Sequence, residues 1–548
     1  MNKEKVKSNV CQIEYCDKPT HKDSKYCIFH ASAEEKTEED FKKALKEYVN
    51  KIKKEDGDYN FQEFIFVGYI NFKEDFDIEI FKNAFFSKAT FEGDVNFAEI
   101  NFDGDAYFIG TIFKGVTFFT GLTFEGNSIF IKTNFHGDAN FTTTIFNGEA
   151  DFKSTNFESI TRFWFATFNG AADFREATFK MNTVFKQTSF MDIADFEAVK
   201  FNGHTTKFTR TTFADNANYF FVKFKGNADF EETIFKYDAN FEEATFKNDV
   251  DFRCKYFFKN LNFSKIKTLP GKKLFIKLNN EEGKISFNRA FLENAYLDIE
   301  LVEGVLIDFT DALIRNTKIK RGQIKNHILQ EKEGQFSKAQ EIYLLLKNNF
   351  HSIGQYKDES WAFTRERDME KMRKSFYSLL NKYKKYRLFK KILKQSNLLK
   401  RVIIKSKILS KWLFSKKAIE WFNLSVSDFI YQYGENPWRV IRFALIIIFL
   451  FAIILNFSGI INSDSTYLII EFIKKSQSDE YTIRYLGPVL GSFLNCLYFS
   501  VVTFTTLGYG DFQPAVGLSR FFVSLESIIG AITMALFVYT FARRTGGR

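Results

Sequence analysis

Proline, cysteine and histidine are scarce in this chain of 548 residues, which has five prolines, five cysteines and six histidines. Three of the cysteines lie within the first 27 residues, so the chain lacks the pattern of a secreted, disulfide-stabilised protein. Its first ten residues, MNKEKVKSNV, contain no apolar run, which argues against a signal peptide. We therefore expect the N-terminal part to stay in a reducing cytoplasm.

Acidic residues are absent from one long segment. Residues 371–419 contain 17 Lys or Arg and no Asp or Glu, although the whole chain carries a net charge of only +10. The remainder is therefore mildly acidic. A one-sign block beside a membrane span favours contact with anionic lipid headgroups, and a solvated helix face is the alternative.

Patterns typical of enzymes, voltage sensors and nucleotide sites are also missing. No Ser/His/Asp set or paired carboxylates stand out, and His136 and His204 are isolated. No apolar segment carries a ladder of arginines, and no glycine-rich phosphate loop is visible. These absences argue against catalysis, a membrane-potential sensor and a dinucleotide site.

The N-terminus contains a candidate metal site with the spacing C-x4-C-x10-C-x2-H, formed by Cys11, Cys16, Cys27 and His30. Three thiolates and one imidazole match a closed tetrahedral zinc site, as in small zinc-knuckle modules. Two close pairs would let a very short segment fold around the metal. His21 is a possible substitute ligand, and three free cysteines near a loose terminus are the alternative.

A repeat of phenylalanine dominates the next 170 residues and accounts for many of the 71 in the chain. One series recurs every eleven residues from Phe91 to Phe201, and a second, from Phe97 to Phe196, interleaves with it. A small or β-branched residue, such as Ala89 or Thr188, precedes most of these positions by two. Neither helical nor strand periodicity gives this spacing. It indicates a coil with a corner every five or six residues and with its rings inside.

This repeat resembles the Phe-rich variety of pentapeptide-repeat proteins, whose fold is a right-handed four-sided β-helix. Two eleven-residue units per coil give about eight coils from Ala84 to Phe257, or about 40 Å at the usual strand spacing. Short A-x-L steps at 290–292 and 295–297 suggest a further fragment of coil. Such a rod needs a cap at each end.

The segment from Gln323 to about Ser427 is expected to form a cytoplasmic helical linker. Ile342, Leu345 and Leu346 share one helical face, and Gly354 marks a turn between two helices. The basic residues 371–419 then alternate with Leu, Ile, Trp and Phe, which suits a helix lying on an anionic leaflet. A linker that packs its apolar face on protein is the alternative.

The C-terminal part contains two apolar segments long enough to cross a bilayer, at 440–461 and 521–542. The segment between them, 487–512, is apolar but too short to cross twice. Arginines at 439, 442, 543, 544 and 548 flank the two spans, so the positive-inside rule places both ends in the cytoplasm. Two spans around a re-entrant segment form the simplest topology.

The motif TTLGYGD, Thr505 to Asp511, ends this re-entrant segment. Non-helical backbone at membrane depth must be buried in protein or line a water-filled cavity. Glycines permit the left-handed conformations with which successive carbonyls can face one way and replace the hydration shell of a cation. The motif resembles the potassium-channel selectivity filter, with Leu507 in place of the commoner Val.

The resemblance implies a homotetrameric pore that conducts potassium ions. It assigns the filter to Thr506, Leu507, Gly508, Tyr509 and Gly510, with ions held by the Thr506 hydroxyl and by carbonyls of the first four. Thr505 and Asp511 would support the filter. It also implies a gating hinge at Gly530 and cavity-lining side chains at Ala531, Met534 and Val538.

Three positions carry further expectations. Val502 stands where some bacterial channels have a glutamate that pairs with the outer-mouth aspartate, so inactivation through such a pair is not expected. Gln513 replaces an aromatic residue, so external block by tetraethylammonium should be weak. Glu526 is costly within a membrane unless paired or hydrated, and we expect it to contact the pore helix or a cavity water.

The sequence thus predicts five parts: a zinc-knuckle-like module (1–35), a helical cap (36–83), a quadrilateral β-helix (84–322, interrupted at about 258–285), a basic helical linker (323–436) and an all-α two-span pore domain (437–548). Little sequence follows the second span, so gating input should come through the N-terminal parts and the linker into the first span. The competing interpretation is a membrane-anchored pentapeptide-repeat scaffold with an inert or nonselective pore.

Overall fold

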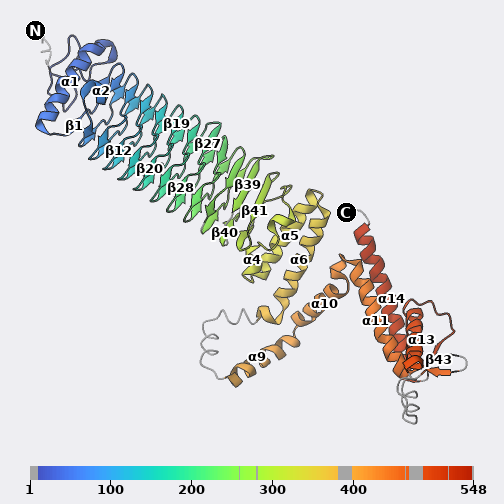
Figure 1. Cartoon of the computed structure of the whole chain (residues 1–548). Helices are drawn as coiled ribbons and strands as arrows, with labels where there is room; N and C mark the ends of the chain where they lie inside the picture. The colour runs from blue at the N-terminus through green and yellow to red at the C-terminus, as the bar shows by residue number, and fades with distance from the viewer. Residues whose placement is uncertain are drawn as a thin grey trace, which may run out of the picture. The chain divides into compact units, whose positions relative to one another are not determined.

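The computed structural model describes residues 10–257, 259–278, 282–379, 398–462, 465–467, 486–515 and 517–545. The chain divides into two compact units, Met1–Glu359 and Ser360–Arg548. Figure 1 shows the first as a long stack of short strands with helices at its ends, and the second as a set of helices.

The first unit is a four-sided β-solenoid. Within the described residues its faces run from β1 (Tyr59–Asn60) to β42 (Val305–Asp308), from β2 (Ile65–Phe66) to β38 (Lys267–Thr268), from β3 (Ile70–Asn71) to β41 (Tyr296–Leu301), and from β4 (Ile80–Phe81) to β36 (Tyr256–Phe257). The faces have 12, 10, 11 and 9 strands, and every neighbouring pair that we describe in them is parallel. The predicted β-helix is therefore confirmed.

Rings fill the solenoid in two directions. From coil to coil they stack almost parallel, as for Phe130 and Phe152, whose centroids lie 4.7 Å apart at 1°. This distance matches the spacing of neighbouring strands, about 4.8 Å. Within a coil they meet edge to face, as Phe152 and Phe163 do at 5.6 Å and 87°. The edge-to-face contacts supply the geometry that aromatic quadrupoles prefer.

Buried threonines at the corners satisfy backbone groups of the preceding coil. The hydroxyl of Thr144 donates to the carbonyl of Phe119 at 2.6 Å, and that of Thr155 donates to Phe130 in the same way. Ala89 and Ala166 take the equivalent position in other coils and are fully buried. This explains why the repeat alternates small and β-branched residues there.

The stack of paired strands in the solenoid is longer than the sequence predicts. It begins at β1 rather than at Ala84, because Tyr59 pairs with Ala84. It also continues through the described part of the interruption expected at 258–285, where β37 (Asn260–Asn262) pairs with β40 (Gly283–Ser286). There Ile276 takes the ring position of Phe252 and is buried, and Thr268 takes that of Phe246, so this part of the repeat is hidden from a search for phenylalanine.

Helices close both ends. At the N-terminal end lie η1 (Ala33–Glu35), α1 (Glu38–Glu55) and α2 (Phe72–Phe76), and α1 buries Phe41, Leu45, Val49 and Ile52. At the other end lie α3 (Arg321–Ile324), α4 (Leu329–Lys332) and α5 (Phe336–Ser352). The Asn349 side chain of α5 bonds both the amide and the carbonyl of Thr317, at 2.9 Å each. Both caps protect the edges of a rod that would otherwise expose unpaired strands.

The predicted linker helices are present. Helix α5 buries Ile342 and Leu346, Gly354 adopts a left-handed φ of 70°, and α6 (Tyr356–Lys374) follows. Next come α9 (Leu398–Leu413), α10 (Lys416–Tyr431) and η2 (Gln432–Gly434). Residues 380–397, the centre of the basic segment, lie outside the described residues.

The second unit ends with the apolar helices α11 (Pro437–Ser458), α13 (Leu486–Phe504) and α14 (Leu518–Thr545). A small antiparallel sheet joins β43 (Ile460–Asn462) to β44 (Ser465–Tyr467) and to β45 (Gln513–Pro514). Asn436 caps α11 through the amide of Trp438, and Pro437 takes the first helical position, where its missing amide costs nothing.

Candidate ion pore and metal centre

Two described helices, α11 and α14, are long and apolar enough to cross a membrane. The shorter α13 lies between them in sequence and packs on both. Buried polar pairs fix the packing: the Ser492 hydroxyl donates to Asn456 at 3.0 Å, and the Ser519 hydroxyl donates to the Gly459 carbonyl at 2.6 Å. The three helices thus form one packed group, with α13 held against both spans.

Glu526 lies in the middle of this group and is fully buried. The hydroxyl of Ser500, on α13, contacts one oxygen of its carboxyl group and also the carbonyl of Ile448, on α11, at 2.8 Å. Glu526 therefore contacts α13, the expected pore helix, which was the first of the two expected positions. Sequence analysis missed Ser500, because a serine in an apolar helix carries no pattern of its own.

The TTLGYGD stretch follows the C-terminal end of α13 as an exposed, non-helical turn. Thr506, Gly508 and Gly510 all have left-handed φ values, of 57°, 58° and 83°. Thr506 is held by a bond from its amide to the Thr503 carbonyl at 3.1 Å. Leu507 and Tyr509 are 59% and 68% exposed, although both are large and apolar. Gly508 and Gly510 thus adopt the left-handed conformations that glycine was expected to permit, and Thr506 adopts one as well.

The outer end of the stretch is held by side chains. The side chain of Tyr498, on α13, lies close to that of Asp511 and interacts with it. The ring of Tyr498 also lies 6.0 Å from that of Phe512. Sequence analysis looked for a partner at position 502, but Val502 is buried and apolar, and the partner comes from one helical turn earlier. Gln513 lies beyond it in β45 and is exposed.

Gly530 lies inside α14 where the end of α13 approaches it closely. A Cβ atom there would come within 2.1 Å of the Phe504 carbonyl oxygen, so the position requires glycine for packing. Its role as a hinge stays a prediction. Ala531, Met534 and Val538 are exposed, whereas Gly530, Thr533 and Thr540 are buried. The three predicted cavity residues therefore share the side of α14 that does not pack on α11 and α13.

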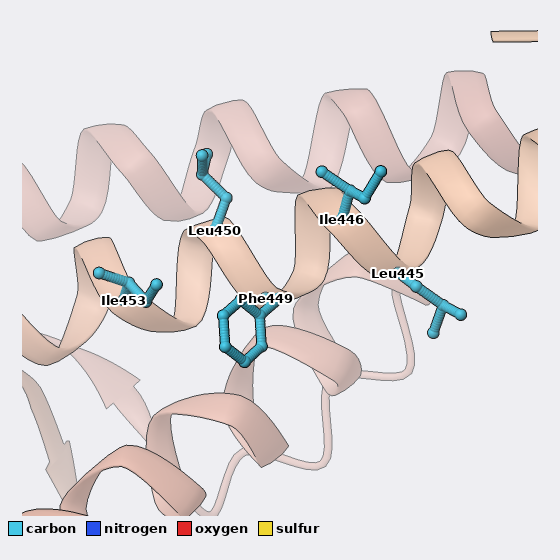
Figure 2. Close-up of a pocket in the computed structure, with 5 residues that line it drawn as sticks. All are labelled: Leu445, Ile446, Phe449, Leu450 and Ile453. Carbon is cyan, nitrogen blue, oxygen red and sulfur yellow. The ribbon is translucent and has the colours of Figure 1, made fainter.

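The outer surface of α11 is apolar. Leu445, Ile446, Phe449, Leu450 and Ile453 line a shallow groove, and Figure 2 shows that all five side chains come from this one helix. Each is at least 41% exposed in the single chain. An apolar surface of this kind suits contact with lipid tails.

The four predicted metal ligands come together at the N-terminal end of the solenoid. The sulfurs of Cys11, Cys16 and Cys27 and the Nδ1 atom of His30 all lie within 4.8 Å of one another. Nδ1 is 3.4 Å from the sulfur of Cys11 and 3.2 Å from that of Cys27. His21, the possible substitute, is not part of this group. The donor set fits a closed tetrahedral site.

The surroundings of the four residues orient the His30 ring and shift the pKa values of Cys27 and of the nearby Lys36. The Nε2 atom of His30 lies 3.3 Å from the carbonyl of Gln62, which fixes Nδ1 as the free ligand atom. Burial raises the pKa of the Cys27 thiol to about 12, so only a bound cation would make it a thiolate near neutral pH. Burial lowers the pKa of Lys36 to about 7, although its amine donates to the carbonyls of Ile28 and Ile65.

Two separate regions of the chain match models of known protein families. Residues 479–546 match the family model of ion channels, and residues 86–133, 130–178 and 208–253 match the model of pentapeptide repeats. Neither is a family of enzymes. No curated protein and no solved structure gives a match. The chain therefore joins a pentapeptide-repeat β-solenoid to a C-terminal ion-channel domain of the two-span, potassium-channel type.

Proposed function

We propose that the chain forms a homotetrameric channel that conducts potassium ions selectively and passively. The observation that carries this proposal is the exposed TTLGYGD turn, with left-handed residues at alternate positions, between a re-entrant helix and the second span. Alternating backbone conformations bring successive carbonyls to the same side of a strand. A ring of such carbonyls replaces the water around a potassium ion.

Each residue of the filter then has a role. Ions bind the Thr506 hydroxyl and the carbonyls of Thr506, Leu507, Gly508 and Tyr509, and Gly510 lets the strand turn away. The nearby side chain of Tyr498 helps to keep Asp511 at the outer mouth. Thr505 supports the strand through its hydroxyl, which donates to the Val501 carbonyl at 2.7 Å.

The single chain supports assembly into a ring. Leu507 and Tyr509 are mostly exposed, and so are Ala531, Met534 and Val538. Non-helical backbone at membrane depth, such as the TTLGYGD turn, needs protein or a water-filled cavity beside it. Three further copies would supply both, with the filter strands around the axis and the exposed side of α14 lining the inner cavity.

In the membrane, both termini of this topology lie in the cytoplasm. Arg439 and Arg442 precede the unbroken apolar run of α11, residues 443–455, and Arg543 and Arg544 lie in the last turn of α14. Residues 371–419 bind anionic lipid headgroups. Helix α10, which begins within this segment, supports the membrane contact, because Ile419, Phe422 and Phe429 are exposed along one of its sides.

The N-terminal metal is zinc, and it has a structural role. Three cysteines and one histidine leave no open coordination position for chemistry. Residues Phe29 and His30 pack against Phe64 of the first coil, with ring centroids at 4.6 Å and 5.2 Å. The metal would therefore hold the cap on the solenoid, and the chain performs no catalysis.

The solenoid and linker regulate opening of the pore. A test is to insert a protease site between Gly354 and Gln355, where the turn has open space, and to cut it during recording from the cytoplasmic side. A change in open probability after the cut, absent without protease, supports regulation. An unchanged open probability would overturn the proposed regulation.

Potassium selectivity is tested by the reversal potential of the purified chain in proteoliposomes under a K⁺/Na⁺ gradient, with Gly508→Ala as the variant. We expect a reversal near the potassium equilibrium potential that the substitution abolishes. A current that does not discriminate between the two ions would overturn the assignment of the filter. Silence across voltages and lipid compositions would leave two explanations, a closed gate that awaits its ligand and the membrane-anchored scaffold.

A further inference from the structure

The cytoplasmic end of the second span is held by an arginine. Arg543 lies in the last turn of α14, and its Nη2 atom is 3.0 Å from a carboxylate oxygen of Glu435. Its Nη1 atom donates to the Tyr433 carbonyl at 3.2 Å. Its guanidinium carbon lies 4.6 Å from the centroid of the Phe363 ring, on α6. One side chain thus joins the end of α14 to the turn before α11 and to the linker helix.

The turn that receives Arg543 is shaped around it. A Cβ atom on Gly434, whose φ is 93°, would lie 3.1 Å from the Arg543 Nη1 atom and 3.2 Å from a ring carbon of Tyr539. Tyr433 also has a left-handed φ, of 57°, which is uncommon for a bulky residue. The Glu435 side chain is only 7% exposed. A buried carboxylate depends on its charged partner far more than an exposed one does.

The same turn is tied to α6 by a second set of contacts. The Tyr433 hydroxyl donates to Asp368 at 3.3 Å, and Lys371 lies 3.8 Å from the same carboxylate group. Lys371 also pairs with Asp428 of α10, which in turn pairs with Arg439 of α11 at 3.1 Å. All of these residues belong to the unit that begins at Ser360. Helix α6 therefore contacts the end of α14 directly, through Phe363, and is linked to the start of α11 through Asp428 of α10 and the turn at Tyr433.

We propose that Arg543 is a positioning residue that clamps the end of the inner helix to α6, so that movement of the N-terminal region reaches the second span directly. The sequence led us to expect gating input through the first span alone. The clamp consists of Arg543, Glu435, Gly434, Tyr433 and Phe363. It rests on the proposed regulation of the pore, and it names the contact through which that regulation acts.

Arg544 offers a matched control, because it is the next residue, carries the same charge and is exposed. The full-length channel with the protease site after Gly354 is recorded as wild type, Arg543→Ala and Arg544→Ala. We expect cutting to change the open probability by about fivefold or more in the wild type and in Arg544→Ala, a range typical of coupling between sites. In Arg543→Ala the cut should change it by less than about twofold.

A cut that acts equally on Arg543→Ala and the wild type would overturn the clamp and leave regulation intact. Phe363→Leu, which keeps the bulk and removes the aromatic face, should reproduce the loss of coupling, and its effect should not add to that of Arg543→Ala. Additive effects would count against a single clamp.

Hydrogen exchange of the full chain in detergent tests the contact without any current. Arg543→Ala should speed exchange in residues 360–374 and 432–436, whereas Arg544→Ala should leave these segments as in the wild type. Equal exchange in all three proteins would overturn the clamp. If cutting changes nothing in the wild type but exchange responds as expected, the regulation fails while the contact stands.

Discussion

Tyr219 occupies a position in the ring stack that phenylalanine takes in the neighbouring coils. It lies between Phe196 and Phe241, with centroids at 4.8 Å and 4.5 Å, and is fully buried. Its hydroxyl has no hydrogen-bond partner among the residues that the structure describes. A buried hydroxyl without a partner is costly, because it loses its bonds to water and gains none.

We expect Tyr219→Phe to raise the free energy of unfolding of the solenoid by about 1–2 kcal/mol. Thermal unfolding of the purified chain should show a higher midpoint for the solenoid transition. Tyr237→Phe is the control, since Tyr237 is 42% exposed and its hydroxyl reaches solvent. A midpoint that is unchanged or lowered in Tyr219→Phe would mean that the hydroxyl is satisfied.

Gln513 permits a second prediction for a single side chain. It is exposed just beyond the filter, where an aromatic ring from each subunit would bind an external quaternary ammonium ion through its face. We expect the wild type to be blocked weakly by external tetraethylammonium and Gln513→Tyr to be blocked at least about fivefold more tightly, corresponding to about 1 kcal/mol of cation–π energy. Strong block of the wild type would contradict this.

The sequence predicted residues that repeat or match a motif, and it missed those whose role depends on a partner far along the chain. The phenylalanine series, the four metal ligands and the TTLGYGD stretch were all visible from spacing. Tyr498 and Ser500 were not, since their roles depend on how α13 packs against other elements. The clamp around Arg543 joins residues 110 and 180 positions apart, and no local pattern reports such a contact.

Among the elements, the packing of α13 on α14 determines what Gly530 can tolerate. We expect Gly530→Ala to prevent assembly of a stable tetramer, because its Cβ atom would overlap the Phe504 carbonyl directly before the filter. Size-exclusion chromatography in detergent should show loss of the tetramer. A hinge role alone predicts instead a normal tetramer with altered open probability.

Gly491→Ala is the control for this variant. Gly491 lies in α13, and a Cβ atom there would meet nothing within 4 Å. Alanine also has the higher helix propensity, so this substitution should leave assembly unchanged. Loss of the tetramer in both variants would point to a general sensitivity of the helices and away from the close approach at Gly530.

The folding of the N-terminal module is expected to depend on a bound metal ion, which can be tested. We expect the purified chain to carry a zinc ion that Cys27→Ser removes, whereas Cys254→Ser, at a buried cysteine of the solenoid, retains it. Metal content is measured by mass spectrometry. Binding energy at such a site is also folding energy, so a strong chelator should increase proteolysis within residues 10–55. A chain that lacks zinc as purified, or that keeps it in Cys27→Ser, would contradict this assignment.

At the scale of the whole molecule, one 22-residue coil is the smallest segment whose deletion keeps the remaining strands of the solenoid in register. Between Ala84 and Phe201 each strand pairs with the strand 22 residues away, as Ser128 pairs with Ala150. We expect deletion of residues 130–151 to preserve the solenoid, the tetramer and the pore, and to shorten the rod by about 4.8 Å. Circular dichroism and chromatography measure the outcome.

Deletion of only eleven residues, 130–140, is the matched comparison. Eleven residues are half a coil, so every later strand would shift to the opposite face of the solenoid. Ser128 would then lie beside a strand that normally belongs to another sheet. We expect this variant to lose solenoid stability by several kcal/mol, because a whole layer of rings is misplaced. Equal stability of the two deletions would show that the faces are interchangeable.

The repeat also gives the solenoid an adjustable length. Because each coil contacts only its neighbours, duplication of a 66-base-pair stretch of the gene would extend the rod by one step without disturbing either cap. The length of the rod could therefore change by whole coils during evolution while the sequence of the pore stays constant.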